Sequence, residues 1–129
     1  MLRVLAIVLC LKLLAAGQLL ADDSDRLASA MDAMRKSQWE TALAEAGKPD
    51  SIGRDIIEWH RLRAKEGTAE DVESFLARRP DWPGLPYLRR RNEELIIEKS
   101  HARVRAFFAD QPPQTPEGAA SLARAHFAK

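Results

Sequence analysis

The amino-acid sequence predicts an all-α protein of stacked helical hairpins, an α-superhelix or solenoid of tetratricopeptide type. Apolar residues recur at spacings of three and four along the chain, and no stretch alternates apolar and polar residues for long enough to form a strand. The predicted hairpins begin 26, 32 and 32 residues apart, near Asp25, Ser51, Pro83 and Thr115. Repeats of about this length are typical of solenoids, in which no hairpin buries its apolar face alone.

Residues 1–21 are predicted to be a signal peptide, which would be removed on export. A basic residue stands near the start, residues 4–17 are nearly all apolar, and small residues follow. Cleavage is expected after Ala21, with Ala16 or Gly17 as alternatives. A membrane-spanning anchor is the rival interpretation, but Lys12 interrupts the apolar run and only about fourteen residues are apolar, fewer than the roughly 20 that a span needs.

Composition and charge argue against several classes of protein. The 129 residues have room for one domain, and 46% hydrophobic with 30% charged residues is ordinary for a globular protein. The formal charge is +1, or −1 after loss of Arg3 and Lys12, so nothing favours binding to nucleic acid or to an acidic membrane. Cys10 is the single cysteine and lies in the predicted signal peptide, which leaves residues 22–129 without a disulfide or a thiolate metal ligand.

Three apolar stripes predict the first helices. The first stripe is Leu27, Met31 and Met34. The second follows a break at Ser37 and comprises Trp39, Ala42, Leu43 and Ala46. The third can be capped by Ser51, is expected to close near Gly67, and comprises Ile52, Ile56, Trp59 and Leu62.

The next helix is expected to be capped by Thr68 and to carry a stripe of Ala69, Val72, Phe75 and Leu76. It must stop near Arg79, because residues that precede proline disfavour helical geometry, and Trp82 and Leu85 are expected to be extended for the same reason. A new helix then begins near Pro83 or Pro86. Trp82 is therefore predicted to fill the joint between two hairpins as a structural residue.

Charged and apolar spacings describe the rest of the chain. Arg89 with Glu93, and Arg90 with Glu94, lie one helical turn apart and predict a solvated, self-neutralised face. Further apolar positions are Leu88, Leu95, Ile96, Val104, Phe107 and Phe108. The final helix, behind residues 115–116, is expected to have one apolar face made of Ala119, Leu122, Ala123 and Phe127. In a solenoid a following helix would cover that face. We expect its outer edge to be open to water as an apolar patch, as if the chain were truncated at its C-terminus from a longer superhelical arm.

Three stretches resemble the amino-terminal superhelical (U-type) region of soluble lytic transglycosylases of the bacterial periplasm. They are DIIEWHRLRAKEG from residue 55, FLARRPDWPGLPYLRRRNEELI from residue 75, and VRAFFADQPPQTPEGAASLARAHFAK from residue 104. The earlier stretch MRKSQWETALAEAG resembles the first hairpin of the same family. Residues 75–88 and the turn at residues 111–115 are the most specific, because helical periodicity does not dictate their prolines and tryptophan.

The resemblance implies a long periplasmic enzyme in which many helical hairpins precede a lysozyme-like domain. That domain cleaves peptidoglycan glycan strands with formation of anhydro-muramic acid, and its glutamate lies in a Glu-Ser pair followed downstream by Gly-Leu-Met-Gln. The chain contains Glu73-Ser74, but Phe75 is needed on an apolar stripe and no Gly-Leu-Met-Gln follows. Glu73 is therefore not assigned as catalytic, and no catalytic domain is recognised within these 129 residues.

No residue pattern indicates a catalytic, cofactor-binding or metal-binding site. His60, His101 and His126 are too scattered for a local metal site, and His126 is expected to pack against a following helix, as if the chain were truncated. Trp59 and Tyr87 could line a sugar groove if they were exposed, but burial is the favoured expectation for both.

The sequence thus predicts a non-catalytic helical scaffold of a lytic transglycosylase, which would contact peptidoglycan glycan strands in the periplasm. The alternative is a stand-alone periplasmic adaptor that binds a protein or peptide on a concave helical face. A truncated gene product without activity is the third possibility. No nucleic acid, and no membrane span after signal removal, is expected in any of these cases.

Overall fold

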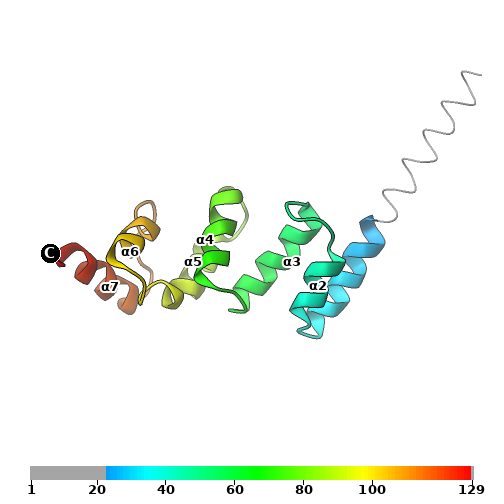
Figure 1. The fold of residues 1–129 in the computed structure, drawn as a ribbon, viewed down its shortest axis with the longest axis horizontal. Coiled ribbons are helices and arrows are strands. Elements are labelled where there is room, and N and C mark those ends of the chain that lie inside the picture. Colours follow the sequence, from blue (N-terminus) through cyan, green and yellow to red (C-terminus); the bar gives the residue numbers. More distant parts are fainter. Residues whose placement is uncertain (1–22, 129) are drawn as a thin grey trace, which may run out of the picture. The chain divides into compact units, whose positions relative to one another are not determined.

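The computed structural model describes residues 23–128, and every regular element among them is helical (Figure 1). The predicted all-α class is therefore confirmed for this part of the chain. The predicted signal peptide and Cys10 lie outside the described residues. No helix between residues 23 and 128 combines the length and the apolar character required to cross a membrane.

The chain forms two compact units, one up to Glu58 and one from Trp59 onward. The first contains a helix at residues 23–35, α2 (Trp39–Glu45) and the first part of α3 (Ile52–Arg63). The second contains the rest of α3, α4 (Ala69–Arg78), α5 (Leu85–Asn92), the 3-10 helix η1 (Glu93–Leu95), α6 (His101–Phe107) and α7 (Pro116–Phe127).

Small residues dominate the core of the first unit. Its buried members are Ala30, Ala33, Ala42, Leu43, Ala46 and Ile57. The predicted break at Ser37 is confirmed, since this residue has a left-handed φ of 57° between the two helices. Met31 and Met34, which were expected to form the contact face, are only partly buried around the alanines. The alanines thus allow the helices to pack closely, and the methionines pack around the edge of that contact.

The predicted apolar face of α3 is wrong at its start. Ile52 is 59% exposed, whereas Ile57 is fully buried. A helical stripe cannot choose between neighbouring isoleucines at 56 and 57, because adjacent positions lie about 100° apart on the helix. Gly53, one turn before Ile57, shows which face of α3 is in close contact. A Cβ at this position would lie 3.3 Å from the Ala46 carbonyl oxygen, so the side of α3 that bears Gly53 and Ile57 packs against the C-terminal end of α2.

The ends of α3 are set by polar groups. The Ser51 hydroxyl accepts a hydrogen bond from the Arg54 amide at 3.3 Å, as expected of an N-cap. At the other end the left-handed residue is Lys65, with φ of 68°, and not the expected Gly67. Gly67 has a different reason to be glycine, since a Cβ there would collide with the buried side chain of Leu62.

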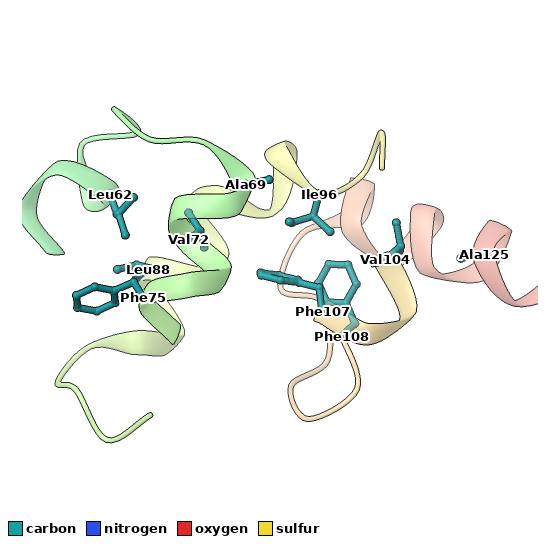
Figure 2. Packing of buried hydrophobic residues seen from close by; sticks show 10 residues of the cluster. All are labelled: Leu62, Ala69, Val72, Phe75, Leu88, Ile96, Val104, Phe107, Phe108 and Ala125. Atoms are coloured by element: carbon teal, nitrogen blue, oxygen red, sulfur yellow. The ribbon is translucent and has the colours of Figure 1, made fainter. Parts of the chain in front are cut away.

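One apolar cluster joins all helices of the second unit. Its buried members are Leu62, Ala69, Val72, Phe75, Leu88, Ile96, Val104, Phe107, Phe108 and Ala125 (Figure 2). Phe75 from α4 is fully buried, and its ring meets the half-buried Trp82 edge to face with centroids 5.8 Å apart. Trp82 therefore packs on the core at the joint after α4, which agrees with its predicted structural role.

The proline-rich joint ends α4 and begins α5. α4 stops at Arg78, and Arg79 leaves helical geometry with φ −130° and ψ 62°, as predicted. Leu85 is instead the first residue of α5, although it precedes Pro86. The reversal needed to start a helix there is made one residue earlier by Gly84, whose φ of 73° is accessible to glycine at little cost.

α7 packs on the rest of its unit through small residues that the apolar pattern did not single out. Its buried residues are Gly118, Ser121 and Ala125, with Leu122 partly buried. The Ser121 hydroxyl donates a hydrogen bond to the Ile97 carbonyl oxygen at 2.9 Å, so a small polar residue can occupy the contact. The outer edge of the predicted apolar face is open to water, as expected: Ala119 and Ala123 are exposed and Phe127 is 86% exposed.

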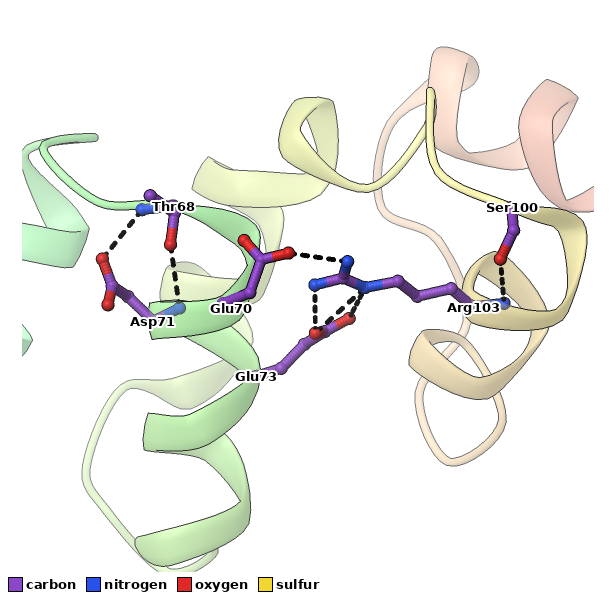
Figure 3. Close-up of polar contacts among 6 residues, drawn as sticks. All are labelled: Thr68, Glu70, Asp71, Glu73, Ser100 and Arg103. Atoms are coloured by element: carbon purple, nitrogen blue, oxygen red, sulfur yellow. Dashed lines mark hydrogen bonds and ion pairs between the residues drawn. The ribbon is translucent and has the colours of Figure 1, made fainter.

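The N-terminus of α4 is closed by a capping box (Figure 3). The Asp71 amide donates to the Thr68 hydroxyl at 3.2 Å, and the Thr68 amide donates to the Asp71 carboxylate at 3.0 Å. Thr68→Ala should therefore lower the free energy of unfolding by about 1 kcal/mol. Urea denaturation followed by circular dichroism measures this loss, and an unchanged midpoint would contradict it.

The capping carboxylate should make stability depend on pH. Burial acts to raise the pKa of Asp71, but hydrogen bonds from Thr68 and Arg61 outweigh it and hold the pKa below its ordinary 3.8. The unfolded chain therefore binds this proton more readily, so the stabilisation is present above about pH 4 and is lost as the pH falls through the lower folded-state pKa. Asp71→Asn should be less stable than the parent at pH 7 and should approach it as the pH falls below the folded-state pKa of Asp71. If the unfolding midpoints of the parent and of Asp71→Asn changed with pH in parallel, the role of the capping carboxylate in this pH dependence would be refuted.

Candidate binding site

One face of α5 collects charged and aromatic side chains. Leu88 and Asn92, four residues apart, are the buried positions of this helix. On the other side lie Tyr87, Arg90 and Arg91 at the helical spacing i, i+3 and i+4, and Glu94 follows in η1. This face is therefore presented outward by the packing of Leu88 and Asn92.

A buried amide fixes α5 against the end of α3. The Asn92 Nδ2 group donates to the Leu62 carbonyl at 3.0 Å and to the Leu88 carbonyl at 2.9 Å. This contact places Lys65, which follows α3, beside Glu94, and their charged atoms lie 2.7 Å apart. A buried hydrogen-bonded amide of this kind gives α5 a single register on α3.

A buried carboxylate fixes α5 against the start of α7. Glu93 is 2% exposed and accepts hydrogen bonds from the Gln114 amide at 2.6 Å, the Thr115 amide at 2.9 Å and the Thr115 hydroxyl. The same hydroxyl accepts from the Gly118 amide at 3.1 Å and so caps α7. The Gln114 side chain donates to the Pro86 carbonyl at 2.8 Å. The loop before α7 is thereby tied to both ends of α5.

These contacts border an open hollow of about 650 Å³. Its charged and aromatic lining consists of Lys65, Tyr87, Arg90, Arg91, Glu94 and Glu117. The volume lies within the roughly 300–1,000 Å³ of small-molecule sites. We refer to it below as the Tyr87 hollow.

Arg63 stacks between two aromatic rings at the edge of the Tyr87 hollow. Its guanidinium carbon lies 4.3 Å from the Trp59 ring centroid and 5.1 Å from the Tyr87 ring centroid. Contacts at these distances are cation–π interactions and hold the tyrosine ring in place. Trp59 is half-buried, but Tyr87 is 46% exposed, so the expectation of burial is wrong for Tyr87. Leu88 takes the inward position, and its neighbour must point elsewhere.

The predicted self-neutralised face of arginines and glutamates is also wrong. Glu93 is buried against backbone amides, and Glu94 pairs with Lys65. Arg89 lies over the Phe107 ring at 4.3 Å and donates to the Phe107 carbonyl. Burial lowers the pKa of Arg89, against the opposing effect of Asp110 and Glu93. Arg90 is left exposed, and among the described residues it makes no hydrogen bond or ion pair.

Glu73 lies in an ion-pair cluster between α4 and α6 (Figure 3). Arg103 donates to its two oxygens at 2.9 and 2.6 Å, and to Glu70 at 2.7 Å. The hydrogen bond from Arg103 lowers the pKa of Glu70. A general acid must present a protonated oxygen to its substrate, whereas both Glu73 oxygens accept hydrogen bonds from a guanidinium. The arrangement is that of a structural ion pair.

The histidines do not meet. His60 is half-buried against the Trp59 ring, with centroids 4.9 Å apart, and burial together with the charge of Arg63 lowers its pKa. His101 and His126 are exposed, so the packing of His126 against a following helix stays a prediction. Within residues 23–128, no three histidine, cysteine, aspartate or glutamate side chains are grouped so that they could hold a metal ion.

Sequence reasoning named Tyr87 but missed Arg90, Arg91 and Lys65 as its neighbours. The helical spacing of Tyr87, Arg90 and Arg91 was a usable signal, since positions three and four apart share a face. The position of Lys65 could not be predicted in this way, because it depends on contacts between α3 and α5. No protein-family model, curated protein or solved structure matches this chain.

Proposed function

We propose that the chain is a non-catalytic N-terminal scaffold of a periplasmic lytic transglycosylase, part of a superhelical arm that positions peptidoglycan glycan strands. A catalytic domain outside these 129 residues would cleave the strands and form anhydro-muramic acid. Export through the signal peptide of residues 1–21 is part of the proposal. The hairpins of the described residues would be the first repeats of a tetratricopeptide-like solenoid.

One observation carries the proposal. The two segments with the most specific resemblance to the family, residues 75–88 and 111–115, are bonded to each other. Gln114 donates to the Pro86 carbonyl at 2.8 Å, and Glu93, just beyond the first segment, accepts from the amides of Gln114 and Thr115. The two segments therefore contribute to one joint, which supports the proposal that they belong to a single feature of that family.

A second observation supports the extended arm. Ala119, Ala123 and Phe127 lie four residues apart on α7 and form an exposed apolar stripe. In a solenoid each hairpin is covered by the next, so a following hairpin would bury this stripe. Translation of the DNA beyond Lys129 tests the proposal. Further hairpins followed by Glu-Ser and Gly-Leu-Met-Gln are expected, whereas a stop codon with no such continuation in any frame would favour the adaptor.

The purified chain is expected to release no anhydro-muropeptides from isolated sacculi. Catalysis requires a carboxylic acid in a water-excluding cleft, and Glu73 is engaged by Arg103. Chromatography of the soluble products measures release, with a complete lytic transglycosylase as positive control. Release by this chain that disappears in Glu73→Gln would overturn the scaffold assignment.

A further inference from the structure

We propose that the Tyr87 hollow binds a sugar that carries a carboxylate group. The inference rests on the proposed function for its biological source, because glycan strands of peptidoglycan contain such a sugar. It rests on the hollow itself for the chemistry. Three features of the lining define that chemistry: an uncommitted guanidinium, carboxylates placed among cations, and an exposed aromatic ring.

The uncommitted guanidinium belongs to Arg90. This side chain is exposed at the hollow, and no group within the described residues pairs with it. Its neighbours are partly engaged, since Lys65 pairs with Glu94 and the Arg91 Nε group points to the Arg63 carbonyl at 3.4 Å. A guanidinium presents parallel N–H donors that match the two oxygens of a carboxylate. Arg90 is therefore the group that would receive the ligand's charge.

The acidic residues limit the charge of the ligand. Glu94 and Glu117 line the same hollow as the cations Lys65, Arg90 and Arg91, so the lining has a formal charge of +1. A singly charged carboxylate suits this balance better than a phosphate dianion or a polyanion, which both carboxylates would repel. Glu117 is exposed and has no partner among the described residues. Its oxygens can accept hydrogen bonds from sugar hydroxyl groups.

The aromatic ring supplies a surface for the sugar itself. Tyr87 is 46% exposed, while the stacked Arg63 fixes its orientation. One face of a pyranose ring is made of C–H groups and packs on an aromatic ring, and its hydroxyls point outward to polar partners. Because Glu93 and Asn92 already hold the surrounding helices, binding would order few additional groups. The hollow is thus organised before a ligand arrives.

A matched pair of sugars tests the inference. N-acetylmuramic acid and N-acetylglucosamine share the ring and the acetamido group, and the first adds a lactyl carboxylate. Both are titrated into the ¹⁵N-labelled full chain, with an acetylated alanine peptide bearing a free carboxylate as the third ligand. N-acetylmuramic acid should bind about tenfold more tightly than N-acetylglucosamine, as expected for one charge-assisted contact. The amide chemical shifts of residues 87–94 and 115–117 should change most on binding.

Two variants and a matched control assign the contacts. Arg90→Gln should weaken N-acetylmuramic acid binding about tenfold and leave N-acetylglucosamine binding unchanged. Tyr87→Ser should weaken binding of both sugars. Arg124→Gln removes an exposed arginine outside the hollow and should change the binding of neither sugar. Circular dichroism of each variant checks the fold, and Arg90 makes no hydrogen bond or ion pair within the described residues that the substitution would remove.

Three results would overturn the inference: no binding of either sugar, equal binding of the two, or binding that Arg90→Gln leaves intact. Peptide binding as tight as that of N-acetylmuramic acid would replace the sugar with a peptide as occupant. The scaffold assignment stands or falls separately, because it is tested by the coding sequence beyond Lys129. A continuation with the catalytic motifs but no sugar binding would remove only the site.

Discussion

Glu93→Ala is expected to destabilise the unit from Trp59 onward by about 3 kcal/mol. The substitution removes the acceptor for the Gln114 amide, the Thr115 amide and the Thr115 hydroxyl at once. A buried donor left without a partner costs about 1–3 kcal/mol, and hydrogen bonds to charged groups are at the upper end of the range. Part of the cost is offset because the loop at residues 111–114 is largely exposed and water can reach it.

Urea denaturation gives the free energy of unfolding, and hydrogen exchange gives its location. Glu98→Ala is the matched control, because Glu98 is exposed and has no partner among the described residues, so it should change stability by less than about 0.5 kcal/mol. The stability of Glu93→Gln should lie between those of Glu93→Ala and Glu98→Ala, since the glutamine keeps one oxygen acceptor. The amides of Gln114, Thr115 and Gly118 should lose protection first. A Glu93→Ala protein as stable as the Glu98→Ala control would show that the buried carboxylate does not hold the loop.

Gly118 offers an independent check on the same contact. A Cβ at this position would lie 2.5 Å from Glu93 Oε2 and 3.2 Å from the Pro113 Cβ atom. Gly118→Ala should therefore destabilise the protein, although alanine is favoured over glycine within a helix by about 1 kcal/mol. In the Glu93→Ala background the closest collision is gone, so the added substitution should cost less. Strictly additive effects would contradict direct contact between the two side chains.

Local rules predicted much of the fold. Thr68 caps α4 and Arg79 ends it, as expected from a hydroxyl before a helix and from a proline after one. Ser37 breaks the first two helices, and Ser51 caps α3. Each of these features depends on a few neighbouring residues, so the printed sequence contains the information required. The all-α class follows from the same helical spacing repeated along the chain.

Features that depend on contacts between helices were predicted poorly. The buried face of α3 is set by Gly53 against the Ala46 carbonyl, and the buried face of α7 by Ser121 against the Ile97 carbonyl. Glycine and serine carry little weight in a search for apolar stripes, yet they allow the close contacts. Glu93 shows the same limit, because its helical spacing from Arg89 suggested an exposed pair and its burial depends on the loop at residues 114–115.

Only part of the candidate site could be predicted from the sequence. Tyr87 was recognised as a residue that could meet a sugar, and its spacing from Arg90 and Arg91 was present in the sequence. The exposure of Tyr87 was not predicted, because an aromatic residue beside a leucine is equally compatible with the buried position. Lys65 and Glu117 reach the hollow only through the Asn92 and Glu93 contacts, which join residues about 20 to 30 positions apart.

Phe75→Ala is expected to have the largest effect of any single substitution considered, about 3–5 kcal/mol. Its side chain is fully buried in the cluster that joins α3, α4 and α5, where it lies near Leu62, Val72 and Leu88 (Figure 2). Removal of the ring leaves a cavity that rigid helices can close only in part. It also removes the edge-to-face partner of Trp82. Such a loss is a third or more of the 5–15 kcal/mol that stabilises a typical domain.

Trp82→Ala should cost less than Phe75→Ala, about 2–3 kcal/mol, because Trp82 is only half-buried and borders an open hollow of about 410 Å³. Phe127→Ala removes the same ring as Phe75→Ala from an 86% exposed position and should change stability by less than about 0.5 kcal/mol. Urea denaturation of the three variants gives the order. A Phe75→Ala protein as stable as Phe127→Ala would mean that the cluster does not hold the helices together. A folded Trp82→Ala protein with unchanged stability and weakened sugar binding would instead make the joint a binding site.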